Sequence, residues 1–202
     1  MIPSCFGGEM RFEPLNLHGA WLITPQRAAD ERGFFARTIC VREFAAQGLN
    51  GAFVQSSISY NRRRGTFRGM HFQWPPSREA KLVRCLRGSI LDILLDLRPD
   101  SASFLRSVQV TLDDSSRNSV YIPAGFGHGF QTLADDAEVQ YHMTDEFRPD
   151  LAGGFRWDDP AFAIELPLPI SVIAPRDAGY PPFDRKSYET RFTSGLVRSA
   201  PA

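Results

Sequence analysis

Residues 81–97 read KLVRCLRGSILDILLDL, two runs of strand-forming residues separated by Gly88. Side chains alternate between the two faces of a strand, so Lys81, Val83 and Cys85 share one face of the first run. If Val83 and Cys85 face an apolar interior, Lys81 faces it too. Glycine at position 88 is typical of a hairpin turn. The stretch therefore predicts two antiparallel strands with a charged group on their inner face.

The second run carries a carboxylate in the corresponding place. Asp92 shares its face with Ile90, Leu94 and Asp96. An inward lysine and an inward carboxylate on adjacent strands would pair, because an isolated buried charge is very costly. We therefore expect Asp92 to support Lys81. The alternative, with Lys81 at a strand end in solvent, fits the pattern equally well.

The rest of the chain also consists mainly of short strand-like runs separated by turn-forming residues. Apolar residues at helical spacing, followed by a glycine, predict one short helix over 41–48. Many short strands with almost no helix between them indicate an antiparallel sandwich or barrel, a mainly all-β fold with a few short helices. The further predicted strands are 20–24, 33–40, 53–60, 107–112, 118–122 and 138–143.

Length and composition fit one domain. The chain has 202 residues, of which 43% are hydrophobic, enough for a packed core. We expect an extension over residues 1–9, a domain over 10–184 and a polar, loosely ordered tail over 185–202. Regular patterning begins at Met10, which is an alternative start.

Lys+Arg and Asp+Glu both number 23, which argues against a general nucleic-acid or membrane surface.

The three cysteines, Cys5, Cys40 and Cys85, are odd in number and widely spaced. They form neither a zinc pattern nor a disulfide framework, and they indicate free thiols in a reducing compartment. The sequence also lacks an apolar run of about 18 residues and a basic segment followed by an apolar core near its start. We expect a cytoplasmic protein.

Residues 121–130 read YIPAGFGHGF, and their Pro-x-Gly-x-x-His spacing resembles the second motif of the cupin β-barrels. Taken alone, His128 is as well explained as a hydrogen-bonded core residue. Metal-binding cupins usually carry a His-x-His pair as well. The stretch RGMHFQWPP (68–76) has His71 but places Gln73 where the second histidine would stand. We therefore expect no metal.

Several stretches together resemble the dTDP-4-dehydrorhamnose 3,5-epimerase family, in the family's order, from about residue 10 to 182. They are DERGFF (30–35), FRGMHFQ (67–73), KLVRCLRG (81–88), DILLDLR (92–98), YIPAGFGHGF (121–130), VQY (139–141) and RWDDP (156–160). The resemblance implies a cupin-like jelly-roll homodimer that works without metal or coenzyme. It implies epimerisation at C3, C5 or both of a 4-keto-6-deoxyhexose on a nucleoside diphosphate. The expected conversion is that of dTDP-4-dehydro-6-deoxy-D-glucose to dTDP-4-dehydro-L-rhamnose.

By motif position the resemblance implies five catalytic residues. His71 resembles the base, Asp177 its carboxylate partner and Tyr141 the acid on the opposite face of the sugar. Lys81 resembles the cation near the keto oxygen and Asp92 its support. The chemistry needs such a set, because a proton removed beside a ketone leaves an enolate that requires a base, an acid and a donor near its oxygen. Histidine suits the base because its ordinary pKa, about 6.5, lies near neutral pH.

The same resemblance implies substrate-binding residues, with the contacts of the DERGFF stretch supplied by the partner subunit. Arg68 lies three residues before His71, so an ideal strand would point the two side chains to opposite faces. Gly69 would permit a bulge that brings both to one pocket. The implied substrate-binding residues are Arg32, Phe35, Gln55, Arg68, His128 and Phe147.

Three positions depart from the thymidine-nucleotide members of the family, and they bear on which base is bound. These are Arg37, Ser57 and Glu146.

Within the family, the alternatives are an epimerase for C3 or C5 alone and one for another nucleotide sugar. A different class of function is a non-catalytic cupin that binds a sugar nucleotide. A metal-dependent cupin oxygenase ranks last, because the His-x-His pair is missing.

Overall fold

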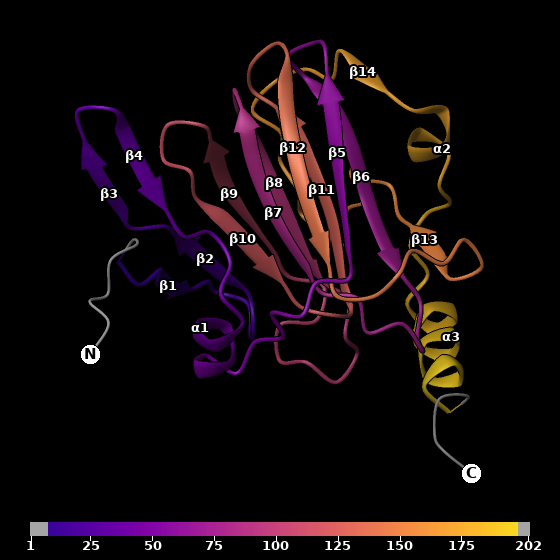
Figure 1. The fold of residues 1–202 in the computed structure, drawn as a ribbon. Helices are drawn as coiled ribbons and strands as arrows, with labels where there is room; N and C mark the ends of the chain where they lie inside the picture. Colours follow the sequence, from indigo (N-terminus) through magenta and orange to yellow (C-terminus); the bar gives the residue numbers. More distant parts are fainter. Residues whose placement is uncertain (1–7, 198–202) are drawn as a thin grey trace.

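The computed structural model describes residues 8–197, which form two antiparallel sheets facing each other (Figure 1). The first sheet has the order β1-β2-β10-β7-β12-β5. Its strands are Arg11–Pro14 (β1), Trp21–Thr24 (β2), Ser119–Ile122 (β10), Lys81–Arg87 (β7), Ala137–Met143 (β12) and Gln55–Asn61 (β5).

The second sheet has the order β13-β6-β11-β8-β9, and one short strand, β14, adds to β6 in parallel. Its strands are Ala152–Gly154 (β13), Thr66–Gln73 (β6), Phe126–Thr132 (β11), Ser89–Asp96 (β8), Ser107–Asp113 (β9) and Val172–Ile173 (β14). Two facing antiparallel sheets of this kind make the predicted jelly roll. The remaining elements are β3 (Arg27–Asp30), β4 (Gly33–Ala36), α1 (Val41–Ala46), α2 (Pro175–Ala178) and α3 (Arg185–Val197).

The predicted hairpin at Gly88 is wrong, although the predicted inner faces are right. β7 pairs with β10 and β12, whereas β8 pairs with β9 and β11. At Gly88, whose φ is +76°, the chain passes from one sheet to the other instead of turning back within it. Val83 and Leu94 are nevertheless fully buried in the core between the sheets. Alternation correctly identified the buried face of each strand, but it carries no information about which strand lies next to which.

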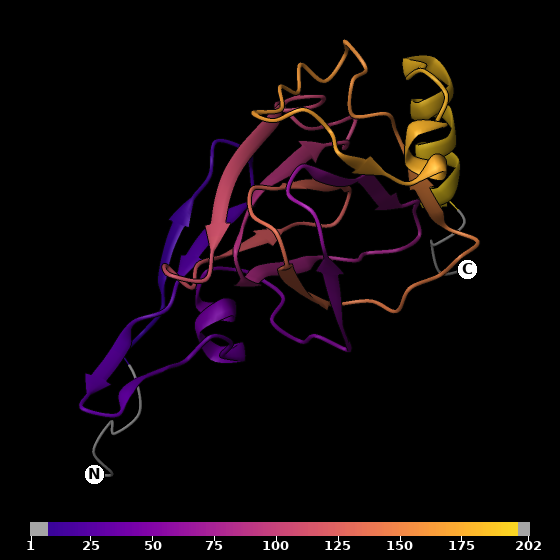
Figure 2. The same cartoon turned by 90° about the horizontal axis from the view of Figure 1, so that it is seen from above.

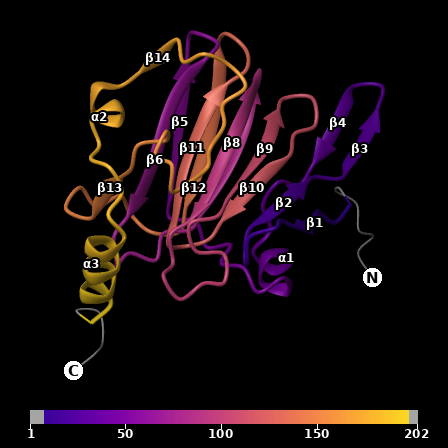
Figure 3. The ribbon, with the colours of Figure 1, turned by 180° about the vertical axis from the view of Figure 1, so that it is seen from behind.

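A second apolar layer covers the outer face of the second sheet, and the C-terminal helix belongs to it (Figure 3). Tyr188 and Phe192, one helical turn apart on α3, are buried there, and the Tyr188 hydroxyl donates to the carbonyl of Leu97 at 2.6 Å. The expectation of a loosely ordered tail is therefore wrong over residues 185–197, and the rest of that tail, 198–202, lies outside the described residues. The segment is mostly polar in sequence, but it forms a helix whose two buried aromatic side chains pack against the sheet.

At the other end of the chain, most of the expected extension over 1–9 lies outside the described residues. Met10 is buried, and its backbone N–H donates to Glu43 of α1 at 2.8 Å. The helix predicted over 41–48 is confirmed as α1. None of the helices found within residues 8–197 has the length and apolar character that crossing a membrane requires.

The β3–β4 hairpin forms a separate two-stranded sheet that extends away from the two large sheets (Figures 1 and 2). Phe34 and Phe35 on this hairpin are 46% and 55% exposed. Adjacent large apolar side chains on an extended hairpin are typical of a surface that another chain covers.

Candidate active site

A cavity of about 460 Å³ opens among strands of both sheets, and most of the predicted site residues line it. The first sheet contributes side chains from β5, β7 and β12, and the second contributes side chains from β6, β11 and β13. The lining includes seven of the predicted residues: Gln55, Arg68, His71, Lys81, His128, Tyr141 and Phe147.

The first pair of the site joins His71 of β6 to Asp177 of α2. His71 Nε2 lies 2.7 Å from Asp177 Oδ1, and Asp177 Oδ2 accepts the backbone N–H of Gly69 at 3.2 Å. Burial alone would raise the pKa of Asp177, but the hydrogen bonds from His71 and Gly69 and the nearby positive charge hold it below its usual range. Asp177 is therefore a carboxylate at neutral pH, able to orient the His71 ring.

A bulge at Gly69 directs both Arg68 and His71 into the cavity, as the sequence predicted. Between β6 and β11, His71 pairs with His128 and Arg68 with Phe130, so the register shifts by one residue. Gly69 has a φ of +133°, and a Cβ there would lie 2.5 Å from the Cα of Gly129. Only glycine fits this bulge.

A second histidine–carboxylate pair occupies the interior. His128 Nε2 lies 2.7 Å from Asp92 Oδ1, and Asp92 Oδ2 has no hydrogen-bond partner among residues 8–197. The expected Lys81–Asp92 pair is wrong, because β7 and β8 lie in different sheets. Lys81 lines the cavity, so it is not a solvent-exposed strand end, and its ammonium group lies 3.2 Å from Glu79.

Tyr141 enters the cavity from β12 of the first sheet, whereas His71 enters from the second. Its ring lies edge-on to His128, with 5.8 Å between the ring centroids. Burial raises the pKa of Tyr141 above its usual range, and the negative charge of Asp92 adds to the effect. The phenol therefore keeps its proton at neutral pH and has it available to donate.

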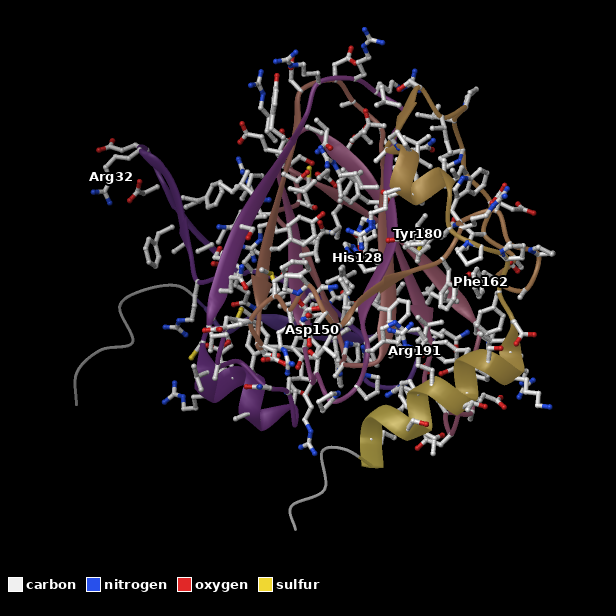
Figure 4. All side chains as sticks on the ribbon, turned by 90° about the vertical axis from the view of Figure 1, so that its right-hand side faces the viewer. Arg32, His128, Asp150, Phe162, Tyr180 and Arg191 are labelled. Carbon is white, nitrogen blue, oxygen red and sulfur yellow. The ribbon has the colours of Figure 1, made fainter. Side chains whose placement is uncertain are left out.

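Four predicted residues are absent from the cavity lining of their own chain. Asp92 and Asp177 hydrogen-bond to two histidines of the lining, whereas Arg32 and Phe35 lie apart from it. Arg32 and Phe35 belong to the β3–β4 hairpin, where Arg32 hydrogen-bonds to Asp30. Figure 4 shows Arg32 at the tip of the hairpin, far from His128. Within one chain they are separate from the site.

The sequence reasoning missed three side chains at the site. Glu79 and Arg176 line the cavity, and the ring of Tyr180 packs against His71. Glu79 lies two residues before Lys81, a spacing that puts both on one face of an extended chain, so strand alternation could have found it. Arg176 precedes Asp177 on the short α2, and Tyr180 lies two positions after α2 ends. The sequence offers no comparable signal for either.

The three positions that depart from the family pattern have separate surroundings. Ser57 lines the cavity, whereas Arg37 forms an ion pair with Glu43 at 2.6 Å. The backbone carbonyl of Glu146 accepts a hydrogen bond from the side-chain amide of Gln73 at 3.3 Å.

Within residues 8–197, no group of three or more His, Cys, Asp or Glu side chains is arranged to hold a metal ion.

A jelly roll whose cavity sets a histidine–carboxylate pair across from a protonated tyrosine defines an acid–base enzyme of the cupin-like class. A family described as dTDP-4-dehydrorhamnose 3,5-epimerase matches residues 14–185, and the chain belongs to that family. It is an isomerase acting on carbohydrates.

Three relatives illustrate the likeness. The chain is 38% identical to the dTDP-4-dehydrorhamnose 3,5-epimerase of Methanothermobacter thermautotrophicus, over 86% of this chain and 95% of that one. It is also 38% identical to the dTDP-4-dehydrorhamnose 3-epimerase of Streptomyces niveus, over 83% and 81%. A solved dTDP-6-deoxy-D-glucose-3,5-epimerase of Legionella pneumophila, in complex with dTDP-4-keto-L-rhamnose, matches with a TM-score of 0.79 and 32% identity, over 85% and 91%.

Proposed function

We propose that the chain epimerises dTDP-4-dehydro-6-deoxy-D-glucose at C3 and C5 to dTDP-4-dehydro-L-rhamnose, without a metal or coenzyme. The observation that carries the proposal is the placement of His71 and Tyr141 on opposite sheets across one cavity. Inversion at carbon needs a base on one face of the sugar and an acid on the other. The relatives' activities agree with this reaction.

His71 is the proposed base. Its Nε2 is held by Asp177, which leaves Nδ1 as the ring nitrogen that takes the proton from C3 or C5. Asp177 fixes the tautomer and stabilises the imidazolium that forms, as in other histidine–aspartate pairs. The electrons of the broken C–H bond move toward the C4 ketone and give an enolate with its charge on O4.

Tyr141 then delivers its proton to the opposite face of the enolate carbon. Two groups of the cavity serve the developing charge on O4: the ammonium of Lys81, held by Glu79, and the imidazole of His128, held by Asp92. In this assignment Asp92 supports His128 rather than Lys81.

The nucleotide contacts follow from the remaining hydrogen bonds of the cavity. Gln55 Oε1 accepts the backbone N–H of Phe147 at 2.9 Å, so the Gln55 side-chain nitrogen is left to donate to the base. Arg68 Nε donates to Asn61 Oδ1 at 2.7 Å, which orients its guanidinium for the diphosphate. The exposed ring of Phe147 lies at the same end and suits stacking on a pyrimidine.

The proposed assembly is a homodimer in which the β3–β4 hairpin of one chain reaches the cavity of its partner. Exposed Phe34 and Phe35 and the distance of Arg32 from its own cavity support this arrangement. Cys40 and Cys85 are free thiols, which suits a reducing cytoplasm and an enzyme of deoxysugar biosynthesis.

Mixing two inactive variants tests the dimer. In a heterodimer of His71→Ala and Arg32→Ala chains, one of the two sites contains both His71 and the Arg32 of the other chain. Activity should reappear when the two variants are refolded together and not when either is refolded alone. Mixtures that stay inactive, with a dimer present by light scattering, would show that each chain completes its own site.

The reaction itself is tested in deuterium oxide with dTDP-4-dehydro-6-deoxy-D-glucose. Deuterium at both C3 and C5 of the product, read by mass spectrometry and NMR, supports the proposal. Exchange at one carbon identifies a single-centre epimerase, and tight binding without exchange identifies a non-catalytic binder. Competition with the UDP-linked sugar determines whether thymidine is preferred, and a chelator should leave the rate unchanged.

A further inference from the structure

We propose that Tyr180 is a positioning residue that holds the His71 ring in line with Asp177; this rests on the proposed function of His71. The aromatic ring of Tyr180 lies edge-on to that of His71, with 6.5 Å between centroids and 71° between planes. Tyr180 is absent from the cavity lining, so it acts through His71 and not on the substrate.

His71 needs such a support because the rest of its surroundings are open. Its side chain is 44% exposed, and Asp177 holds one end of the ring. A single hydrogen bond fixes the distance between two groups but lets the ring tilt about the contact. Packing against the ring removes that freedom and keeps the other nitrogen directed at the substrate.

The element that carries Asp177 also depends on outside contacts. α2 has only four residues, and its N-cap, Ala174, provides no side-chain hydrogen bond. Gly179 alone separates Tyr180 from α2, and the guanidinium of Arg176 lies 5.8 Å from its ring centroid. The Tyr180 ring therefore lies beside His71 and beside Arg176, the residue that precedes Asp177.

Gly154 makes room for the Tyr180 ring. It lies on β13 directly across from His71 on β6. A Cβ at Gly154 would come within 2.2 Å of Tyr180 Cζ and 2.5 Å of its hydroxyl oxygen, closer than any real contact. The Tyr180 ring thus packs against the backbone of β13 at Gly154, beside His71.

The Tyr180 hydroxyl takes no part in this arrangement. It is buried and has no hydrogen-bond partner among residues 8–197. A buried hydroxyl without a partner lowers stability. The benzene ring, and not the hydroxyl, is what the site uses, so phenylalanine should replace Tyr180 without loss.

Three variants test the proposal in the full-length enzyme. Tyr180→Ala should lower kcat by about 10- to 100-fold through misalignment of His71, with KM nearly unchanged because no substrate contact is lost. Tyr180→Phe should retain the wild-type kcat. Gly154→Ala, which displaces the ring without removing it, should lower kcat like Tyr180→Ala, and the double variant should be no worse than either single one.

Proton NMR provides a readout that does not depend on turnover. The ring proton shared by His71 and Asp177 should give a downfield resonance that persists in Tyr180→Phe and is lost to solvent exchange in Tyr180→Ala. Unchanged kcat in Tyr180→Ala, or a Tyr180→Phe variant as slow as Tyr180→Ala, would overturn the role of the ring. A wild-type enzyme that shows the resonance but exchanges no deuterium into the sugar would instead refute the proposed reaction. If Tyr180→Ala fails to fold, Gly154→Ala decides the question.

Discussion

Two histidine–carboxylate pairs lie next to each other on neighbouring strands, and they differ in their surroundings. His71 and His128 face each other across β6 and β11, and each has its Nε2 2.7 Å from an aspartate oxygen. The side chain of His71 is 44% exposed, whereas that of His128 is 5% exposed. The same pair of groups can thus serve as a solvent-accessible proton acceptor at the cavity surface or as a buried part of its wall.

The carboxylates reinforce the contrast. Asp177 arrives from the short α2 segment, and its second oxygen accepts the Gly69 N–H. Asp92 is fully buried on β8, and its second oxygen has no partner among the described residues. A base must exchange protons with substrate and solvent, which suits His71. The buried pair is held by strand geometry and is better suited to orienting a donor.

The largest difference between the pairs should appear in catalysis. We expect His71→Ala to lower kcat about 10²- to 10⁴-fold, the usual contribution of a general base. The rate of conversion and the rate of deuterium wash-in should fall together. Arg148→Ala, which removes an exposed ion pair with Asp150, serves as the control and should leave both rates intact. Substantial wash-in by His71→Ala would assign proton removal to another group.

For stability, we expect the opposite order: replacing His128 should cost more free energy of unfolding than replacing His71. His128→Ala leaves the Asp92 carboxylate buried and unpaired, so the free energy of unfolding should fall by about 3–5 kcal/mol. His71→Ala should cost less than half of that, because water can enter the exposed space left by its ring. Urea unfolding of both variants measures the difference. Equal losses would mean that exposure does not distinguish the pairs.

Tyr141 tests whether the acid acts separately from the base. Tyr141→Phe removes the only ionisable proton of the side chain and should lower the rate of inversion about 10²-fold. His71 remains, so deuterium should still enter the substrate with retained configuration. NMR of the recovered sugar separates the two results. Loss of both exchange and inversion would show that Tyr141 is needed for proton removal itself.

The smallest expected effect concerns pH. Because the pKa of Asp177 is lower in the folded chain than in the unfolded one, its carboxylate adds stability above the ordinary aspartate pKa of about 3.9. That stability is lost as pH falls through the lower, folded-state value. Asp177→Asn should therefore be less stable than wild type by about 1.5–3 kcal/mol at pH 5 and above, the contribution of a hydrogen bond to a charged group. The gap should close toward pH 2, and a constant gap in urea unfolding would contradict the assignment.

Strand alternation predicted much of this site, and strand pairing explains what it missed. The inward direction of Lys81 and Asp92 was correct, because alternation is a local property of the backbone. Their pairing was wrong, because the change of sheet at Gly88 depends on contacts with strands distant in sequence. The bulge at Gly69 was predictable from one glycine between two functional side chains.

Other features had little or no local signal. α3 is anchored by Tyr188 and Phe192 within a mostly polar segment, so composition suggested a loose tail. Tyr180 contacts His71, more than 100 positions earlier in the chain, and the residues next to Tyr180 in the sequence do not indicate that contact. Arg32 lies on an extended hairpin, away from the cavity of its own chain.

The separation of 106 residues between His71 and Asp177 has a consequence for how the enzyme is made. All the strands of the described chain precede Asp177 in sequence. A growing chain can therefore pair both sheets, and place His71 and His128 side by side, before Asp177 and Tyr180 have left the ribosome. The buried pair can be complete at that stage, whereas the exposed pair needs Asp177, which follows all of these strands. Catalytic activity thus reports that synthesis has reached the C-terminal segment, and a prematurely ended chain would contain the barrel without its base in working order.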